Sequence, residues 1–224
     1  AVFEDGATKA DVTKKAEAQL EPTAIFASNT STLPITGLAE ASSRPANFIG
    51  LHFFSPVDKM PLVEIIRGKQ TSDETLARAM DFVKKIRKTP IVVNDSRGFY
   101  TSRVFATYVT EGLTMLAEGV NPALIENAGK AAGMPVGPLA LADEVSLELM
   151  HRVRTQTKKD LGDAYKADGS EPVLQTMVEK LGRIGKKAGK GFYEYPADGG
   201  KRLWPDLAKH FPVKPEAEQP ALAD

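Results

Sequence analysis

Short apolar segments alternate with amphipathic helical segments along the first 94 residues, and this alternation restricts the fold more than any other feature. The expected strands are residues 23–27, 48–54, 62–66 and 90–93, and the expected helices are residues 8–20, 35–41 and 73–87. Strands that are separated by helices usually pair in parallel, and their helices cover the sheet. We therefore expect an α/β region with a parallel-rich sheet that is covered on both faces.

The character of the sequence changes near residue 95, where we expect a domain boundary. Residues 103–117 carry apolar side chains at helical spacing, and Pro122 stands at the favoured first position of another helix. Further helices are expected over 140–161 and 173–181. The second half is thus predicted to be all-helical, and the Pro-containing segment 212–224 is predicted to be an exposed linker or tail.

Composition excludes several classes of protein. The 29 basic and 29 acidic residues cancel, so no global basic field favours nucleic-acid binding or polybasic membrane docking. There is no cysteine, which excludes a disulfide scaffold and thiolate chemistry. No apolar run reaches the roughly 20 residues of a membrane span. We expect a soluble, cytoplasmic protein, and because the chain opens at Ala1 in an apolar segment, we expect it to be truncated within a buried strand.

His52 is the first candidate catalytic residue among three histidines. It lies near the end of the expected strand 48–54, and ligands of open α/β sheets bind outside the carboxyl ends of strands. An imidazole there can act as a general base. The alternative is a core histidine with satisfied hydrogen bonds, and spacing leaves both open. His151 and His210 are expected to be structural or solvated.

Glu64 strengthens the case for His52. It lies inside the apolar strand 62–66, where an unpaired carboxylate would be costly to bury. If residues 55–61 form a turn, Glu64 would come beside His52, where a carboxylate fixes the tautomer of the imidazole and stabilises its charged form. The alternative is a glutamate that faces solvent at a sheet edge.

Ser31 closes a polar turn that follows the first expected strand. It can bond a ligand oxygen or cap the next helix, and the motif alone favours the cap. A hydrolase triad of Ser31, His52 and Glu64 is disfavoured because no G-x-S-x-G motif surrounds the serine. The Gly- and Lys-rich run 182–191 does not fit a phosphate loop, although Lys187 could contact an anionic cofactor. No acidic or histidine cluster has metal-ligand spacing, so no metal is expected.

Several motifs occur together along the chain: AVFED at 1–5, FASNTSTL at 26–33, GLHFFSP at 50–56 with LVEII at 62–66, GMPVGP at 133–138 and KAGKGFY at 187–193. Together they resemble the 3-hydroxyacyl-CoA dehydrogenases, especially the dehydrogenase part of multifunctional fatty-acid oxidation subunits. The resemblance implies that residues 1–94 are the C-terminal portion of a Rossmann-like NAD-binding domain. It also implies that residues 95–211 are the helical dehydrogenase domain.

The resemblance also implies site roles. His52 would take the proton of the substrate 3-hydroxyl while a hydride passes to NAD, and Glu64 would orient His52. Ser31 would bond the substrate oxygen or the cofactor carboxamide, and Ser102 would contact substrate. The residues that would contact NAD are Val2, Phe3, Glu4, Lys9, Ser31, Ser55 and Lys187.

The sequence departs from the family pattern in two respects. Many relatives have asparagine where Ser55 and Ser102 stand, and a serine lacks the second polar group of an amide. No G-x-G-x-x-G turn, which would hold the pyrophosphate at a helix N-terminus, occurs in the chain. We therefore expect weak NAD binding by these 224 residues.

The resemblance leaves three readings of function. The first is NAD-dependent oxidation of (3S)-3-hydroxyacyl-CoA in fatty-acid β-oxidation, by a homodimer or within a larger complex. The second is a stand-alone 3-hydroxybutyryl-CoA dehydrogenase with the same His52 and Glu64. The third is a non-catalytic piece, whose helical half serves dimerisation or packing within a multifunctional complex.

Overall fold

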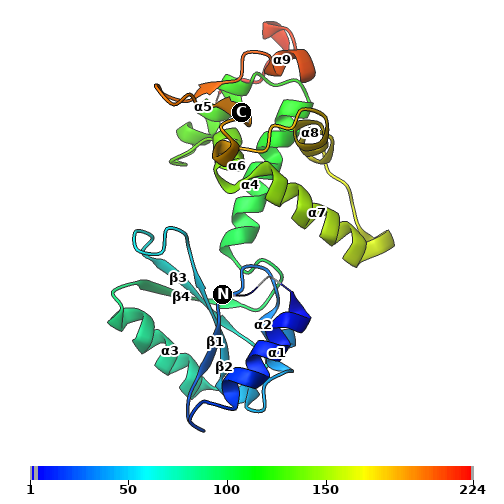
Figure 1. The fold of residues 1–224 in the computed structure, drawn as a ribbon. Helices are drawn as coiled ribbons and strands as arrows, with labels where there is room; N and C mark the ends of the chain where they lie inside the picture. Colours follow the sequence, from blue (N-terminus) through cyan, green and yellow to red (C-terminus); the bar gives the residue numbers. More distant parts are fainter. Residues whose placement is uncertain (1, 3–4, 223–224) are drawn as a thin grey trace. The chain divides into compact units, whose positions relative to one another are not determined.

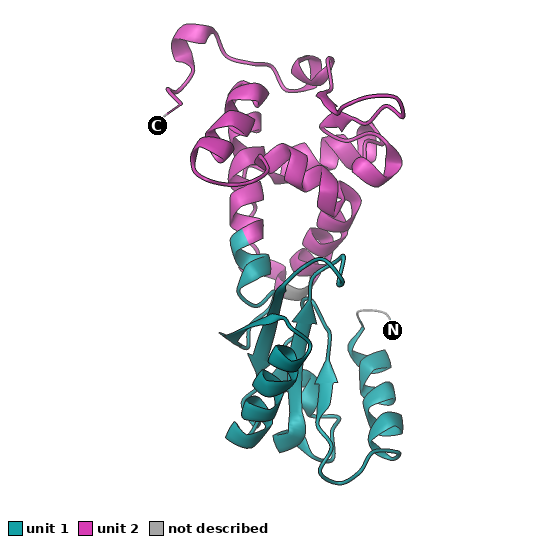
Figure 2. Ribbon diagram, turned by 90° about the vertical axis from the view of Figure 1, so that its left-hand side faces the viewer, with its two compact units in different colours: residues 1–104 teal, residues 105–224 magenta. Residues whose placement is uncertain are grey.

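The computed structural model describes residues 2 and 5–222, except for the side chain of residue 160 (Figure 1). It divides the chain into two compact units, residues 1–104 and 105–224 (Figure 2). The first unit contains the sheet and the second unit contains most of the helices.

The sheet of the first unit has the strand order β1-β2-β3-β4. Its strands are β1 (Phe26–Ser28), β2 (Phe48–Phe53), β3 (Leu62–Arg67) and β4 (Thr89–Asn94). The pairs β1–β2 and β3–β4 are parallel, whereas β2 and β3 are antiparallel. The expected α/β fold is confirmed, and the turn expected over residues 55–61 reverses the chain in the middle of the sheet.

Helices cover both faces of this sheet, as the sequence predicted (Figure 1). They are α1 (Gly6–Glu17), α2 (Ile35–Ala39) and α3 (Asp73–Lys85). Alternate residues of a strand point to opposite faces. One face therefore packs Phe48 and Ile66 against α2, and the other packs Ile49, Leu51, Val63 and Ile65 against α3.

The third helix shows why the local sequence forms these elements. The hydroxyl of Ser72 accepts a hydrogen bond from the Thr75 amide at 3.1 Å and caps the helix. Acidic residues occupy the first turn and lysines the last turn, which complements the helix dipole. Ala79 and Val83 lie one turn apart and are both buried, so one stripe of the helix faces the sheet.

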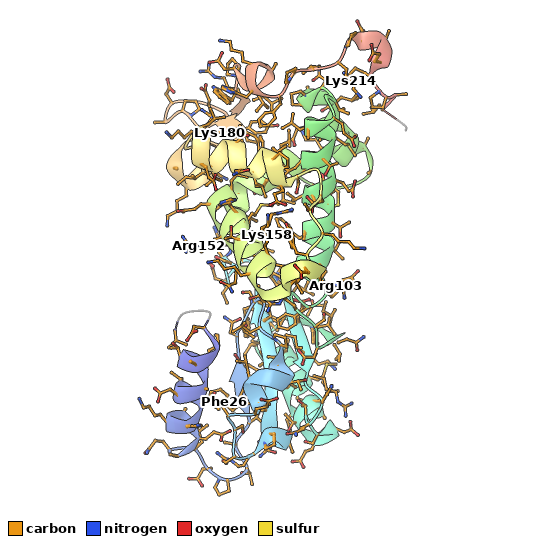
Figure 3. The ribbon with its side chains drawn as sticks, turned by 90° about the vertical axis from the view of Figure 1, so that its right-hand side faces the viewer. Phe26, Arg103, Arg152, Lys158, Lys180 and Lys214 are labelled. Atoms are coloured by element: carbon orange, nitrogen blue, oxygen red, sulfur yellow. The ribbon has the colours of Figure 1, made fainter. Side chains whose placement is uncertain are left out.

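The second unit contains six α-helices among its described residues. They are α4 (Thr101–Ala117), which begins in the first unit, α5 (Pro122–Ala131), α6 (Pro138–Val145), α7 (Leu147–Leu161), α8 (Glu171–Gln175) and α9 (Leu207–His210). A π-helical turn, Thr176–Lys180, continues α8. Figure 3 shows the side chains of this unit, including Arg152 and Lys158 on α7.

Two expectations for this half are wrong. The single helix expected over residues 140–161 is two helices, because Ser146 adopts φ 96° and its hydroxyl accepts from the Leu149 amide to start α7. The half is also not all-helical, since β5 (Tyr193–Glu194) and β6 (Arg202–Leu203) form an antiparallel pair. Short strands of two residues leave almost no alternation for a sequence pattern to detect.

The segment after Phe211 contacts the turn between α4 and α5. The Lys214 amide donates to Gly119 O at 2.9 Å, and the side chain of Gln219 donates to the same oxygen at 3.1 Å. Gln219 Oε1 accepts from the Asn121 amide at 2.9 Å. Lys214 is labelled on this segment in Figure 3. The Pro-containing tail is therefore held by hydrogen bonds, although most of its side chains are exposed.

The second unit has one large buried apolar cluster, which is built from α4 to α9 and the β5–β6 pair. Val109, Leu113 and Leu116 supply the α4 side of this cluster. The other two histidines lie outside it: His151 Nε2 is 3.1 Å from Glu179 Oε1, and His210 stacks on Trp204. Among the described residues, no helix has both the length and the apolar composition that crossing a bilayer requires.

Candidate active site

The candidate site lies at the carboxyl ends of β1 and β2. These strands are parallel, with Ser28 opposite Gly50, so both strands end at the same edge of the sheet. The side chain of Asn29 joins the two exits, because its Oδ1 accepts a hydrogen bond from the Phe53 amide at 3.0 Å. This edge is where open α/β sheets bind ligands.

His52 and Glu64 meet at this edge through the register of the antiparallel pair. The two residues are opposite each other in β2 and β3, and His52 Nδ1 lies 2.7 Å from Glu64 Oε2. His52 is 6% exposed and Glu64 is fully buried. A solvent-facing Glu64 at a sheet edge is therefore excluded, and the carboxylate has the partner that its burial requires.

The second carboxylate oxygen of Glu64 is also bound. Its Oε1 accepts hydrogen bonds from the Tyr100 amide at 3.1 Å and the Thr101 amide at 2.8 Å, at the start of α4. Burial by itself would raise the pKa of Glu64, but the hydrogen bonds from His52 and Thr101 outweigh it and hold the pKa below the ordinary value of 4.5. Glu64 is thus ionised at neutral pH.

The ionised carboxylate determines the tautomer of His52. A carboxylate only accepts hydrogen bonds, so Nδ1 carries the proton, and Nε2 of a neutral ring holds a lone pair. Within the part of the chain that is described, Nε2 has no hydrogen-bond partner. A nitrogen that is unpartnered but not sealed from solvent fits a ligand hydroxyl, and the arrangement can take a proton from it and return the proton.

The other expected site residues of the first unit lie on several elements. Ser31 is exposed in the bend after β1, and Ser55 is exposed two residues after β2. Ser102 is half-buried in the first turn of α4, directly after the Thr101 amide that binds Glu64. Lys9 lies on α1 and is half-buried, and Val2 is 43% exposed.

Three expected cofactor residues cannot be placed beside this group. Phe3 and Glu4 lie outside the described residues. Lys187 belongs to the second unit, where it is exposed in a short 3-10 turn, Lys186–Ala188. That turn ends at Gly189, whose φ of 75° suits a residue without a side chain.

Two residues that position this edge of the sheet, Asn29 and Asp95, were not predicted from the sequence. The Asp95 carboxylate accepts from the Ile35 amide at 2.8 Å and the Thr36 amide at 2.7 Å, so it caps α2. The cap that the motif favoured for Ser31 is thus supplied by a residue at the end of β4. Asn29 lay inside the polar turn and could have been singled out, whereas nothing near Asp95 in the sequence points to α2.

A buried acidic residue of the second unit was also missed. Asp143 is 1% exposed and accepts from the amides of Phe192 and Tyr193, both at 2.8 Å, and from the Tyr195 hydroxyl at 3.0 Å. Burial raises its pKa to about 6, against the lowering effect of these hydrogen bonds. Asp143 fixes the strand that follows the Lys187 turn, and its partners account for its polar atoms. No group of three or more possible metal ligands occurs among the described residues.

Comparison with known proteins identifies the family of the chain. Residues 1–96 match the family model described as 3-hydroxyacyl-CoA dehydrogenase, NAD binding domain, and residues 98–195 match the corresponding C-terminal domain. The fatty acid oxidation complex subunit alpha of Shewanella halifaxensis is 47% identical over 205 residues, which are 90% of this chain and 28% of that protein. The chain therefore spans about a quarter of the length of such curated relatives.

Solved structures show the same likeness. The (S)-3-hydroxybutyryl-CoA dehydrogenase PaaH1 of Ralstonia eutropha has a TM-score of 0.78 and 38% identity, and the match covers 88% of this chain and 69% of that one. FadB2 of M. tuberculosis has a TM-score of 0.77 and 33% identity, with the same coverage. The resemblance seen in the sequence motifs is confirmed. This chain belongs to the 3-hydroxyacyl-CoA dehydrogenase family.

Proposed function

We propose that this chain contributes the catalytic pair for the NAD-dependent oxidation of a (3S)-3-hydroxyacyl-CoA to a 3-ketoacyl-CoA, and for the reverse reduction. The observation that carries the proposal is the His52–Glu64 contact of 2.7 Å at the carboxyl ends of the strands. An ionised, buried carboxylate holds the imidazole with a lone pair on Nε2. That atom is unpartnered within the described residues and is suited to a substrate hydroxyl.

The chemistry follows from this arrangement. Nε2 of His52 takes the proton of the 3-hydroxyl as the C–H electron pair leaves carbon 3, and the C–O bond becomes a carbonyl. Bound NAD would supply the hydride acceptor, so the oxidation would remove one proton and one hydride from the substrate. Glu64 stabilises the imidazolium that forms. Ser31, in the bend at the same sheet edge, donates a hydrogen bond to the substrate oxygen or to the cofactor carboxamide.

The residues present fit the nicotinamide end of the cofactor better than its pyrophosphate. The first unit carries four of the expected cofactor contacts, namely Val2, Lys9, Ser31 and Ser55. The second unit carries Lys187. Phe3 and Glu4 remain proposed contacts. The 224 residues include no G-x-G-x-x-G turn to place a helix N-terminus against the phosphates.

Weak NAD binding is the first expected outcome. Calorimetric titration should give a much lower affinity for this chain than for a longer chain that adds a Gly-rich strand, turn and helix. The phosphate-binding amides account for the difference. Equal affinities would contradict the assignment of these residues to the nicotinamide end alone.

The substitution His52→Gln tests the catalytic assignment. General acid–base groups contribute roughly 100- to 10,000-fold to rate, so we expect acetoacetyl-CoA reduction by the longer chain to fall by at least about 100-fold. His210→Gln is the matched control, because His210 stacks on Trp204 outside the candidate site. Activity that survives His52→Gln intact would remove His52 from the mechanism.

A second candidate function is a dehydrogenase specialised for the four-carbon substrate. The likeness to (S)-3-hydroxybutyryl-CoA dehydrogenase PaaH1 favours it, whereas the curated relatives are subunits of fatty acid oxidation complexes. Rates across an acyl-CoA series from four to sixteen carbons separate the two. We also propose that the protein works as a homodimer or within such a complex in the cytoplasm, and light scattering of the purified protein tests the first of these assemblies.

A further inference from the structure

Phe99 combines three unusual features beside the candidate pair. Its ring is 1% exposed, its ring centroid lies 5.9 Å from that of His52, and its backbone adopts φ 47°. A left-handed backbone is uncommon for residues other than glycine, and especially for large ones, because Cβ approaches the carbonyl oxygen. Strain of this kind persists only where the surrounding structure holds it, and it clusters at functional sites.

We propose that Phe99 is a positioning residue for His52 and Glu64, which holds the imidazole through its ring and the carboxylate through its backbone. This inference rests on the proposed function of the His52–Glu64 pair. It assigns Phe99 a role that acts through His52 and Glu64.

The ring of Phe99 restrains the imidazole. His52 packs against two aromatic rings in tilted geometry, Phe54 at 4.6 Å and Phe99 at 5.9 Å between centroids. Phe54 is half-buried directly after β2, but Phe99 belongs to the core cluster that includes Phe48 and Ile66. Phe99 therefore fixes the imidazole against the rigid part of the unit and keeps water away from the contact with Glu64.

The backbone of Phe99 aims two amides at Glu64. Gly98 and Phe99 have consecutive positive φ angles of 75° and 47°, and the next two amides, of Tyr100 and Thr101, donate to Glu64 Oε1. Successive amides that converge in this way form an anion-binding concavity. The Gly98 amide also donates to Thr32 O at 3.4 Å, which links this turn to the bend that contains Ser31.

The ring of Phe99 and the amides that follow it both act on the charge of Glu64. The amides keep Glu64 ionised, and the ring keeps the Glu64–His52 hydrogen bond in a dry environment, where it is stronger than in water. If the ring is shortened, water reaches the pair and the imidazole gains rotational freedom. The imidazole and the carboxylate would then no longer hold a fixed orientation, while the other expected site residues stay in place.

Phe99→Leu tests this inference, with Phe48→Leu as the matched control. Both phenylalanines are 1% exposed and belong to the same core cluster, but Phe48 stacks on Phe26 and has no ring contact with His52. The first readout is the Nδ1–H proton of His52 in protein with 15N-labelled histidine, which needs no turnover. Only three histidines contribute to this spectrum.

We expect Phe99→Leu to speed solvent exchange of the Nδ1–H proton by about tenfold or more, because the pair is no longer shielded. In the longer chain, the kcat for acetoacetyl-CoA reduction should fall by about tenfold or more while KM changes by less than about threefold, since only the orientation of the base is disturbed. Phe48→Leu should leave the exchange rate and kcat within about twofold of the original protein. Thermal unfolding of both variants shows the shared cost to the core.

Equal effects of Phe99→Leu and Phe48→Leu on proton exchange would overturn the inference, because Phe99 would then be an ordinary core residue. Phe99→Gly separates the two routes, since glycine adopts the same φ without strain and keeps the turn without the ring. If it matches Phe99→Leu, the ring carries the effect. If His52→Gln leaves activity intact, the proposed function fails, whereas a silent Phe99→Leu beside an inactive His52→Gln removes only the role of Phe99.

Discussion

Glu64 shows how one residue can serve chemistry and architecture together. Its Oε2 binds His52, and its Oε1 binds the first amides of α4, so the carboxylate both orients the imidazole and caps a helix of 17 residues. A negative charge at a helix N-terminus is stabilised by the helix dipole. The same interactions that keep Glu64 ionised for its proposed catalytic role therefore stabilise the fold.

This dual role predicts a specific dependence of stability on pH. The folded-state pKa of Glu64 lies below its ordinary value of 4.5, so the unfolded chain binds its proton more readily. The stability that Glu64 contributes is fully present above about pH 4.5, and it is lost as pH falls through the lower folded-state pKa. Denaturant unfolding between pH 7 and pH 3 should show this loss.

Glu64→Gln should weaken folding at pH 7 and should remove this part of the acid dependence, because glutamine does not titrate. The exposed residue Glu74, on α3, offers the control Glu74→Gln, which should keep the acid dependence. An acid dependence that is unchanged in Glu64→Gln would contradict the pKa direction assigned to Glu64.

At the level of elements, the break between α6 and α7 is the clearest case of tertiary control. Ser146 adopts φ 96° and accepts from the Leu149 amide at 3.4 Å. The Leu147 amide, which follows the break, donates to Ile184 O at 3.1 Å. The carbonyl oxygen of Ile184, 37 residues further along the chain, thus accepts a hydrogen bond from an amide in the first turn of α7. This contact allows α6 and α7 to be separate helices that meet at Ser146.

Substitutions at Ser146 should separate the cap from the backbone strain. Ser146→Ala removes the cap and keeps the positive φ, so we expect a loss of about 1 kcal/mol in the free energy of unfolding. Ser146→Gly should be at least as stable as the original protein, because relief of about 1 kcal/mol of strain offsets a cap loss of a few tenths. Denaturant melts of both variants measure the difference. A glycine variant less stable than the alanine variant would contradict the left-handed backbone.

At the level of the whole molecule, the chain consists of two compact units, and the tail adds hydrogen bonds within the second. Gln219 makes contacts with Gly119, Asn121 and Lys214. Apart from these, few groups of the tail are buried. The tail thus depends on a small number of polar contacts with the α4–α5 turn.

Gln219→Ala should release the tail without unfolding the unit. Hydrogen exchange at the Asn121 amide should increase clearly, because its acceptor is the Gln219 side chain. The unfolding temperature should change little, since hydrogen bonds at the surface contribute little to stability. Gln175→Ala, which removes an exposed bond to Glu179, is the control and should leave Asn121 unchanged. Unchanged exchange at Asn121 in Gln219→Ala would show that the tail is held by other contacts.

The sequence by itself determined the local elements and the candidate pair. Periods of two and of 3.6 residues marked the four strands of the first unit and most helices, because these periods reflect which side chains face the core. His52 and Glu64 were recognisable because a polar group inside an apolar strand needs a partner. Family motifs added the roles of Ser31, Ser55, Ser102, Lys9 and Lys187, which remain proposals.

Only the tertiary structure decided which distant groups meet. The register of β2 and β3 placed Glu64 opposite His52 and excluded a glutamate that faces solvent. Asp95 caps α2 from about 60 residues away, and Phe99 reaches His52 through a strained turn. No local pattern encodes such contacts, because they form only after both partners have been placed by the packing of other elements. The sequence thus predicted the pair that is proposed to react, and the packing determined which other residues hold that pair in position.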